Sequence, residues 1–90
     1  MATIRKKVWK EYFGKIIARE KRFELRLADF EINEGDTFVL EEWDNEKQEY
    51  TGRKTETTAT YILKTKDLPF WSQEEVDKYG FQIIQFDIKK

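Results

Sequence analysis

Residues 19–26 read R-E-K-R-F-E-L-R, and charged and apolar residues alternate from Arg22 to Leu27. Side chains of an extended strand point alternately to its two sides, so alternation separates the two kinds. One side would carry Phe23, Leu25 and Leu27, and the other Arg22, Glu24 and Arg26. The stretch therefore predicts a short strand whose polar side holds one acid between basic residues.

A short amphipathic helix is predicted before this strand, and a tight turn after it. Apolar residues recur at helical spacing on one wide face, at Trp9, Tyr12, Phe13, Ile16 and Ile17. Lys15 lies off this face near the C-terminal end of the helix, where the helix dipole favours a positive charge. Residues 33–36 read N-E-G-D, and Gly35 can supply the unusual backbone angle that a turn requires.

The rest of the chain reads mainly as strands. Strands are predicted at residues 4–8, 37–43, 54–64 and 81–88, with a long polar hairpin tip over 44–52. Ser72 and Glu75 have the spacing of a capping box, which begins a short second helix that Gly80 ends. These elements predict an α+β fold: one domain over residues 1–90, built on a small, mostly antiparallel β-barrel with two helices.

Composition excludes several kinds of chemistry. The 90 residues include no cysteine and no histidine, so disulfides, Cys/His zinc sites and His general bases are excluded. No metal and no cofactor is expected. Charged residues make up 39% of the chain, with Lys and Glu dominant, as in proteins from hot environments. Without an apolar run of transmembrane length or a signal peptide, the sequence favours a cytoplasmic protein without membrane contact.

The net charge of −1 hides an uneven distribution along the chain. Residues 1–27 hold nine basic and three acidic residues, a charge of +6. Residues 28–50 hold nine acidic residues and one lysine, a charge of −8. The basic third could form a local anion-attracting patch, or it could pair with the acidic middle across the fold.

The charged stretch resembles the signature of the ASCH group within the PUA-like β-barrel superfamily, G-x-K-x-x-E-x-R after a helix. Lys21, Glu24 and Arg26 match its charged positions, whereas Arg19 stands where the family has glycine. Gly35-Asp36 matches the turn that follows. Residues 43–44 (W-D) and 49–53 (E-Y-T-G-R) are similar to a hairpin in a small uncharacterised branch of the superfamily.

This resemblance implies a barrel with a cleft beside the first helix, lined by Lys21, Glu24 and Arg26. RNA or nucleotide binding has been proposed for the family at large, which makes RNA or a modified nucleoside the expected partner. Arg22 and Lys15 would add charge at the periphery. Trp71 could stack on an unpaired base, or it could cap an end of the barrel.

Two other functions stay open. A bacterial relative group deacetylates N4-acetylcytidine with a Lys, a Thr and a Glu, which makes Lys21, Glu24 and Glu74 candidate catalytic residues here. Glu24 occupies the threonine position, so that hydroxyl is missing. The other possibility is a non-catalytic protein-interaction module that uses the acidic segment 28–50.

A structural alternative competes with any site. Charged residues that alternate along a strand also form ordinary ion-pair ladders on solvated faces, where they contribute little stability. In a partly dry cleft, the same residues would present donors to a phosphate or a polarised carbonyl, and Glu24 could accept from a base amino group. A monomer is the favoured oligomeric state.

Overall fold

The computed structural model describes residues 1–65, 72–78 and 80–89. The elements follow in the order β1 (Thr3–Trp9), α1 (Lys10–Ile17), β2 (Phe23–Leu27), β3 (Thr37–Asp44), β4 (Glu49–Lys64), α2 (Gln73–Lys78) and β5 (Phe81–Ile88). The predicted α+β class is confirmed. In the described part of the chain, no helix is long and apolar enough to span a membrane.

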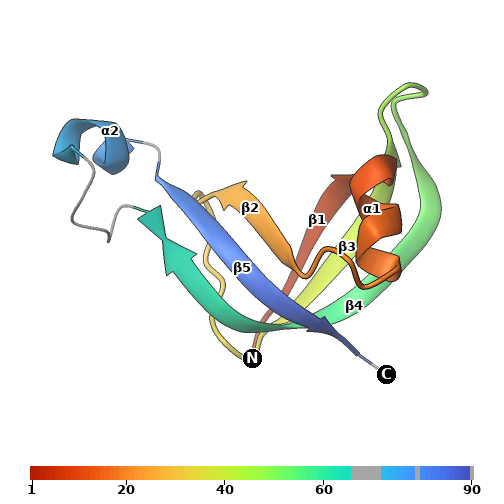
Figure 1. The fold of residues 1–90 in the computed structure, drawn as a ribbon, viewed down its shortest axis with the longest axis horizontal. Helices are drawn as coiled ribbons and strands as arrows, with labels where there is room; N and C mark the ends of the chain where they lie inside the picture. The colour runs from red at the N-terminus through yellow and green to blue at the C-terminus, as the bar shows by residue number, and fades with distance from the viewer. Residues whose placement is uncertain (66–71, 79, 90) are drawn as a thin grey trace.

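The five strands form one sheet in the order β1-β3-β4-β5-β2, which curls into a half-barrel (Figure 1). Three of the four strand pairs are antiparallel, as expected, whereas β1 runs parallel to β3. The strands β1 and β2 are therefore the two edges of the sheet. The curl brings these edges towards each other, and the first helix lies beside β1 and β3, from where the chain returns to β2 (Figure 1).

The long strand β4 holds the two halves of the sheet together. Residues 49–58 pair with β3 and residues 57–64 pair with β5, so β4 belongs to both hairpins. The register shifts between Ala59 and Tyr61, and a bulge of this kind bends a strand and increases its twist. The bend allows one strand of 16 residues to follow the curvature of the half-barrel.

The hairpin between β3 and β4 is tighter than predicted, because pairing continues to Asp44 and Glu49. Asp44 closes the turn, since its Oδ1 accepts the backbone N–H groups of Glu46 and Lys47 at 3.0 and 3.1 Å. These bonds, with that of Lys47 the stronger influence, hold the pKa of Asp44 below its ordinary value. The predicted tip over residues 44–52 is therefore wrong in length.

The predicted turn at residues 33–36 is present and is fixed by Asp36. This buried carboxylate accepts the N–H groups of Ala2 at 3.0 Å and Asn33 at 2.9 Å, which ties the start of β1 to the turn. Both bonds, that of Ala2 first, hold the pKa of Asp36 below its ordinary value. Gly35 adopts φ +94°, as the turn requires, and its N–H bonds to the carbonyl of Ala59.

The core lies on the concave side of the sheet, where Phe38 of β3 and Phe86 of β5 meet edge to face with ring centroids 6.4 Å apart. The helix α1 contributes Phe13 and Ile16, which are fully buried. The other three residues of its predicted apolar stripe, Trp9, Tyr12 and Ile17, are about half exposed, which corrects the prediction. The eight-residue helix rests on β1 and β3, and this leaves one flank free to border the opening between the sheet edges.

Candidate functional site

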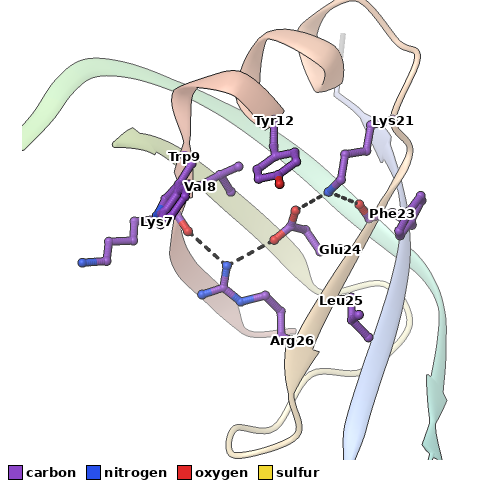
Figure 2. A pocket seen from close by; sticks show the side chains of 9 residues that line it. All are labelled: Lys7, Val8, Trp9, Tyr12, Lys21, Phe23, Glu24, Leu25 and Arg26. Atoms are coloured by element: carbon purple, nitrogen blue, oxygen red, sulfur yellow. Dashed lines mark hydrogen bonds and ion pairs between the residues drawn. The ribbon is translucent and has the colours of Figure 1, made fainter. Parts of the chain in front are cut away.

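A hollow lies between the two sheet edges, beside α1, as the family resemblance implied. It has a volume of about 580 Å³, within the usual range for small-molecule sites. Its lining comes from β1, α1 and β2 together with the turn before β2 (Figure 2): Lys7, Val8, Trp9, Tyr12, Lys21, Phe23, Glu24, Leu25 and Arg26. We call this hollow the cleft.

Glu24 is the centre of the cleft and is almost completely buried, with 6% of its side chain exposed. Its Oε1 accepts a hydrogen bond from Lys21 Nζ at 2.7 Å, and its Oε2 accepts one from Arg26 Nη1 at 3.2 Å (Figure 2). A buried carboxylate requires such partners, because an unpaired charge in the interior is strongly unfavourable. The structure therefore brings together the three residues that the signature predicted.

Arg26 also links the two edges of the sheet. Its Nη1 donates to the backbone carbonyl of Lys7 on β1 at 3.0 Å (Figure 2). Lys21 Nζ likewise donates to the carbonyl of Phe23 at 2.8 Å. A guanidinium has five N–H donors and an ammonium has three. Among the described residues, Arg26 Nε and Nη2 and one proton of Lys21 have no hydrogen-bond acceptor, so the cleft keeps donors for a ligand.

Aromatic rings form the walls of the cleft beside these charges. Trp9, Tyr12 and Phe23 are each about half exposed. The ammonium of Lys21 lies 4.9 Å from the ring centroid of Phe23 and 5.8 Å from that of Tyr12, within the range of cation–π attraction. The site therefore combines flat apolar surfaces with directed donors and one acceptor.

The turn between α1 and β2 places Lys21 at the cleft, and it forms with arginine where the signature has glycine. Arg19 adopts the left-handed conformation, φ +64°. The N–H of Arg19 bonds to the carbonyl of Ile16 at 3.0 Å, and that of Glu20 bonds to Lys15 at 2.9 Å. This is the Schellman pattern that ends many helices, usually with glycine at the left-handed position. The departure from the signature therefore leaves the turn intact.

Replacing Arg19 with glycine should raise the free energy of unfolding by about 0.5–1 kcal/mol. A non-glycine residue in the left-handed region costs about 1–2 kcal/mol, which glycine avoids. Part of this stabilisation is offset because glycine makes the unfolded chain more flexible. Urea unfolding followed by tryptophan fluorescence measures the change. The control Glu20→Gly lies next to it, where no positive φ is relieved, and should lower stability. A loss of stability in Arg19→Gly would show that the turn is not strained.

A second ion pair, between the buried Glu42 and the largely exposed Arg53, lies behind α1 and was not predicted. Glu42 of β3 accepts from Arg53 Nε and Nη2, both at 3.0 Å, and from the hydroxyl of Thr51. The guanidinium of Arg53 also lies 5.1 Å from the ring centroid of Phe13. Its hydrogen bonds hold the pKa of Glu42 below its ordinary value, and the same contact raises the pKa of Arg53. The pair joins the β3–β4 hairpin to the helix that walls the cleft.

Comparison with known proteins places the chain in a family. Residues 5–76 match the family model described as a domain of unknown function, DUF3850. The chain belongs to the DUF3850 family. This DUF3850 chain is 35% identical over 70 residues to an uncharacterised 12.9 kDa protein in the GpA 3′ region of Escherichia phage P2. The match covers 78% of the chain and spans 60% of the length of the phage protein.

A solved structure shares the fold of this DUF3850 chain. The crystal structure of the hypothetical protein PH0355 superposes with a TM-score of 0.66 over 99% of this chain and 100% of that one, at 20% sequence identity. This likeness supports the half-barrel fold. None of these matches carries the name of the ASCH or PUA-like group, so membership of that group remains a prediction.

Other predicted site residues of the DUF3850 chain lie outside the cleft. Arg22 is exposed and its Nε donates to the carbonyl of Arg19. Lys15 is exposed and lies 3.9 Å from Glu20. Glu74 is exposed on α2, which lies at the far end of the molecule from α1 (Figure 1). Trp71 lies outside the described residues.

The described residues of this DUF3850 chain include no group of three Asp or Glu side chains that lie close enough together to bind a metal ion. One of the two bonds of the capping box predicted before α2 is present, that from the Glu75 backbone to Ser72. Glu75 N–H donates to Ser72 Oγ at 3.4 Å, and the Ser72 hydroxyl donates to the Glu75 carboxylate. Glu75 is therefore engaged at the helix terminus.

Proposed function

We propose that this protein binds single-stranded RNA or a nucleotide in the cleft between α1 and β2. The observation that carries the proposal is Glu24, a buried carboxylate between two cations that line an open cleft. A buried carboxylate is unfavourable unless well-placed partners satisfy it, and here Lys21 and Arg26, which stay partly exposed at the cleft, do so. A solvated ion-pair ladder would leave Glu24 exposed, and here it is not.

The cleft chemistry suits a nucleotide. The planar donors of Arg26 match a phosphate or the acceptor edge of a base, and the third proton of Lys21 adds a point charge. Glu24 retains lone pairs for a base amino group. Tyr12 and Phe23 offer ring faces on which an unpaired base can stack.

The charge distribution supports an anionic ligand. Among the described residues, only one ion pair joins the basic segment 1–27 to the acidic segment 28–50, between Lys10 and Asp44 at 3.5 Å. Direct ion pairs between these two segments are therefore few in the described part of the chain. Asp36, Glu42 and Asp44 of the acidic segment are buried and hydrogen-bonded, which weakens the case for an acidic docking face.

Binding of a labelled single-stranded RNA, followed by fluorescence anisotropy, tests the proposal. We expect saturable binding that competes with free nucleotides and weakens with salt, with a slope of about −1.4 in a log–log plot if two cations meet phosphates. A flat titration with both RNA and nucleotides at low salt would reject the proposed function. Saturable binding without competition by nucleotides would assign the RNA to a surface outside the cleft.

A second function rests on the contact between Lys21 and Glu24. Glu24 could take a proton from water that attacks the acetyl carbonyl of N4-acetylcytidine, which breaks the C–N bond and releases acetate and cytidine. Glu74 lies outside the cleft lining, so Glu24 is the base in this scheme. Chromatography after incubation with N4-acetylcytidine should show cytidine with the wild-type protein and none with Glu24→Gln. Absence of product with the wild type would exclude this reaction.

A further inference from the structure

A second hollow lies next to the cleft, along the same edge strand β2. It has a volume of about 380 Å³. Its lining comes from β1, β2, the segment after β2 and the start of β5: Lys6, Leu25, Arg26, Leu27, Asp29, Phe30 and Phe81. Leu25 and Arg26 line the cleft as well, so the two hollows are neighbours. We call this one the second hollow.

The second hollow repeats the chemistry of the cleft. The ammonium of Lys6 lies 4.1 Å from the ring centroid of Phe30, much as the ammonium of Lys21 lies 4.9 Å from that of Phe23. Asp29 is exposed and, among the described residues, has no hydrogen-bond or ion-pair partner. Each hollow therefore offers one ammonium, one carboxylate and an aromatic ring.

Arg26 lies at the border between the two hollows. Its Nη1 donates to Glu24 in the cleft and to the carbonyl of Lys7 on β1 (Figure 2). On β1, the cleft is lined by Lys7 and Val8, whereas the second hollow is lined by Lys6. Within the described part of the chain, Nε and Nη2 of Arg26 have no acceptor. A guanidinium with free donors is therefore shared by both hollows.

This arrangement matches two successive nucleotides of one strand. Their bases are joined through a phosphodiester, and the forked donors of a guanidinium suit phosphate oxygens. A base in either hollow can donate from its amino group to the carboxylate there and can stack on a ring. Two cations, Lys6 and Arg26, face a single acid in the second hollow, so its charge favours an anionic backbone.

We propose that the cleft and the second hollow bind adjacent nucleotides of a single strand, with the phosphodiester between them on Arg26. This inference rests on the proposed function and names its ligand: a strand of at least two nucleotides and not a mononucleotide. The exposed rings and methyl groups of Phe81 and Leu27 form the wall for the second base.

Isothermal titration calorimetry with cytidine monophosphate (CMP) and the dinucleotide cytidylyl-cytidine (CpC) tests the inference. Each probe has one phosphate, and the diester of CpC carries less charge than the monoester of CMP, so a site that senses charge alone binds CMP more tightly. We expect CpC to bind at least about tenfold more tightly than CMP, because a second base is stacked.

The two probes separate this inference from the proposed function. Equal affinity for both, or tighter binding of CMP, would overturn the second hollow as a site and leave nucleotide binding in the cleft intact. Absence of binding with both probes and with longer RNA would reject the proposed function and this inference with it.

Substitutions in the second hollow should affect CpC alone. Lys6→Gln and Asp29→Ala should each weaken CpC binding by about fivefold, the effect of one hydrogen bond, and leave CMP binding unchanged. Asp29→Ala removes a negative charge, so the electrostatic field alone would strengthen binding of either anion. The control Arg5→Gln removes a positive charge from the next, exposed position of β1, outside both hollows, and should change neither affinity by more than about twofold.

Circular dichroism verifies that the variants are folded, and the exposed Asp29 carries the test alone if Lys6→Gln does not fold. The inference is wrong if Asp29→Ala leaves CpC binding unchanged, or if it weakens CMP and CpC equally. A loss in Arg5→Gln as large as that in Lys6→Gln would likewise contradict it, because binding would then follow net charge.

Discussion

The double variant Lys21→Ala/Arg26→Ala should bind single-stranded RNA or nucleotide at least about a hundredfold more weakly than the wild type. Each residue can make a charge-assisted hydrogen bond worth about 1.5–3 kcal/mol to an anionic ligand, and about 1.4 kcal/mol corresponds to a tenfold change in affinity. The variant also leaves Glu24 without the two partners that neutralise it, so the cleft would repel an anion. Fluorescence anisotropy with a labelled RNA measures the loss.

The matched control is Lys15→Ala/Arg22→Ala, which removes the same two charges from exposed positions outside the cleft. Its affinity should fall by less than about threefold, since charges at this distance act only through a screened field. Equal losses in the two double variants would show that binding follows net charge and not the cleft. Because the first variant leaves a buried carboxylate, the triple variant with Glu24→Gln is measured as well, and it should remain folded and bind equally weakly.

Replacing Phe13 with alanine should lower the free energy of unfolding by about 3–5 kcal/mol, the usual cost of removing a buried phenyl ring. Phe13 is 1% exposed, belongs to the core and lies under the guanidinium of Arg53. The loss is a large part of the 5–15 kcal/mol that stabilises a typical domain, so a shift of the urea midpoint will be obvious.

The neighbouring substitution Tyr12→Ala separates stability from binding. Tyr12 is half exposed and lines the cleft, so its removal should cost less than about 1 kcal/mol of stability while weakening ligand binding. A similar loss of stability in both variants would mean that α1 packs through both flanks. If the Tyr12→Ala variant binds the ligand with wild-type affinity, a base does not stack on the Tyr12 ring.

The alternation over residues 22–27 predicted β2 correctly, but periodicity does not say which side of a strand is buried. In the structure, Glu24 is buried and Phe23, Leu25 and Leu27 are about half exposed. The side of β2 that carries Glu24 can be buried because Lys21 and Arg26 donate hydrogen bonds to the Glu24 carboxylate. The family signature predicted that the three residues lie together, and their local spacing alone could not have shown that the group is buried.

Long-range pairing explains what the sequence did not predict. The parallel pairing of β1 with β3 joins residues 34 positions apart, such as Thr3 with Thr37, and no local pattern indicates it. The Glu42–Arg53 pair likewise depends on the register of β3 and β4. The sequence feature that could have indicated this ion pair is the motif at residues 49–53, which contains Arg53. Exposure of Trp9 and Tyr12 follows from where α1 rests on the sheet, which helical periodicity does not determine.

An NMR titration of the wild-type protein with cytidine, a nucleoside monophosphate and a short single-stranded RNA tests the central claim most directly. We predict that the largest shifts fall on Lys21, Glu24, Arg26 and Tyr12, whereas the amides of the distant helix α2 stay unchanged. Shifts confined to residues outside the cleft, or none with any of the three ligands, would contradict the claim and reduce the charged cluster to a structural link between β1 and β2.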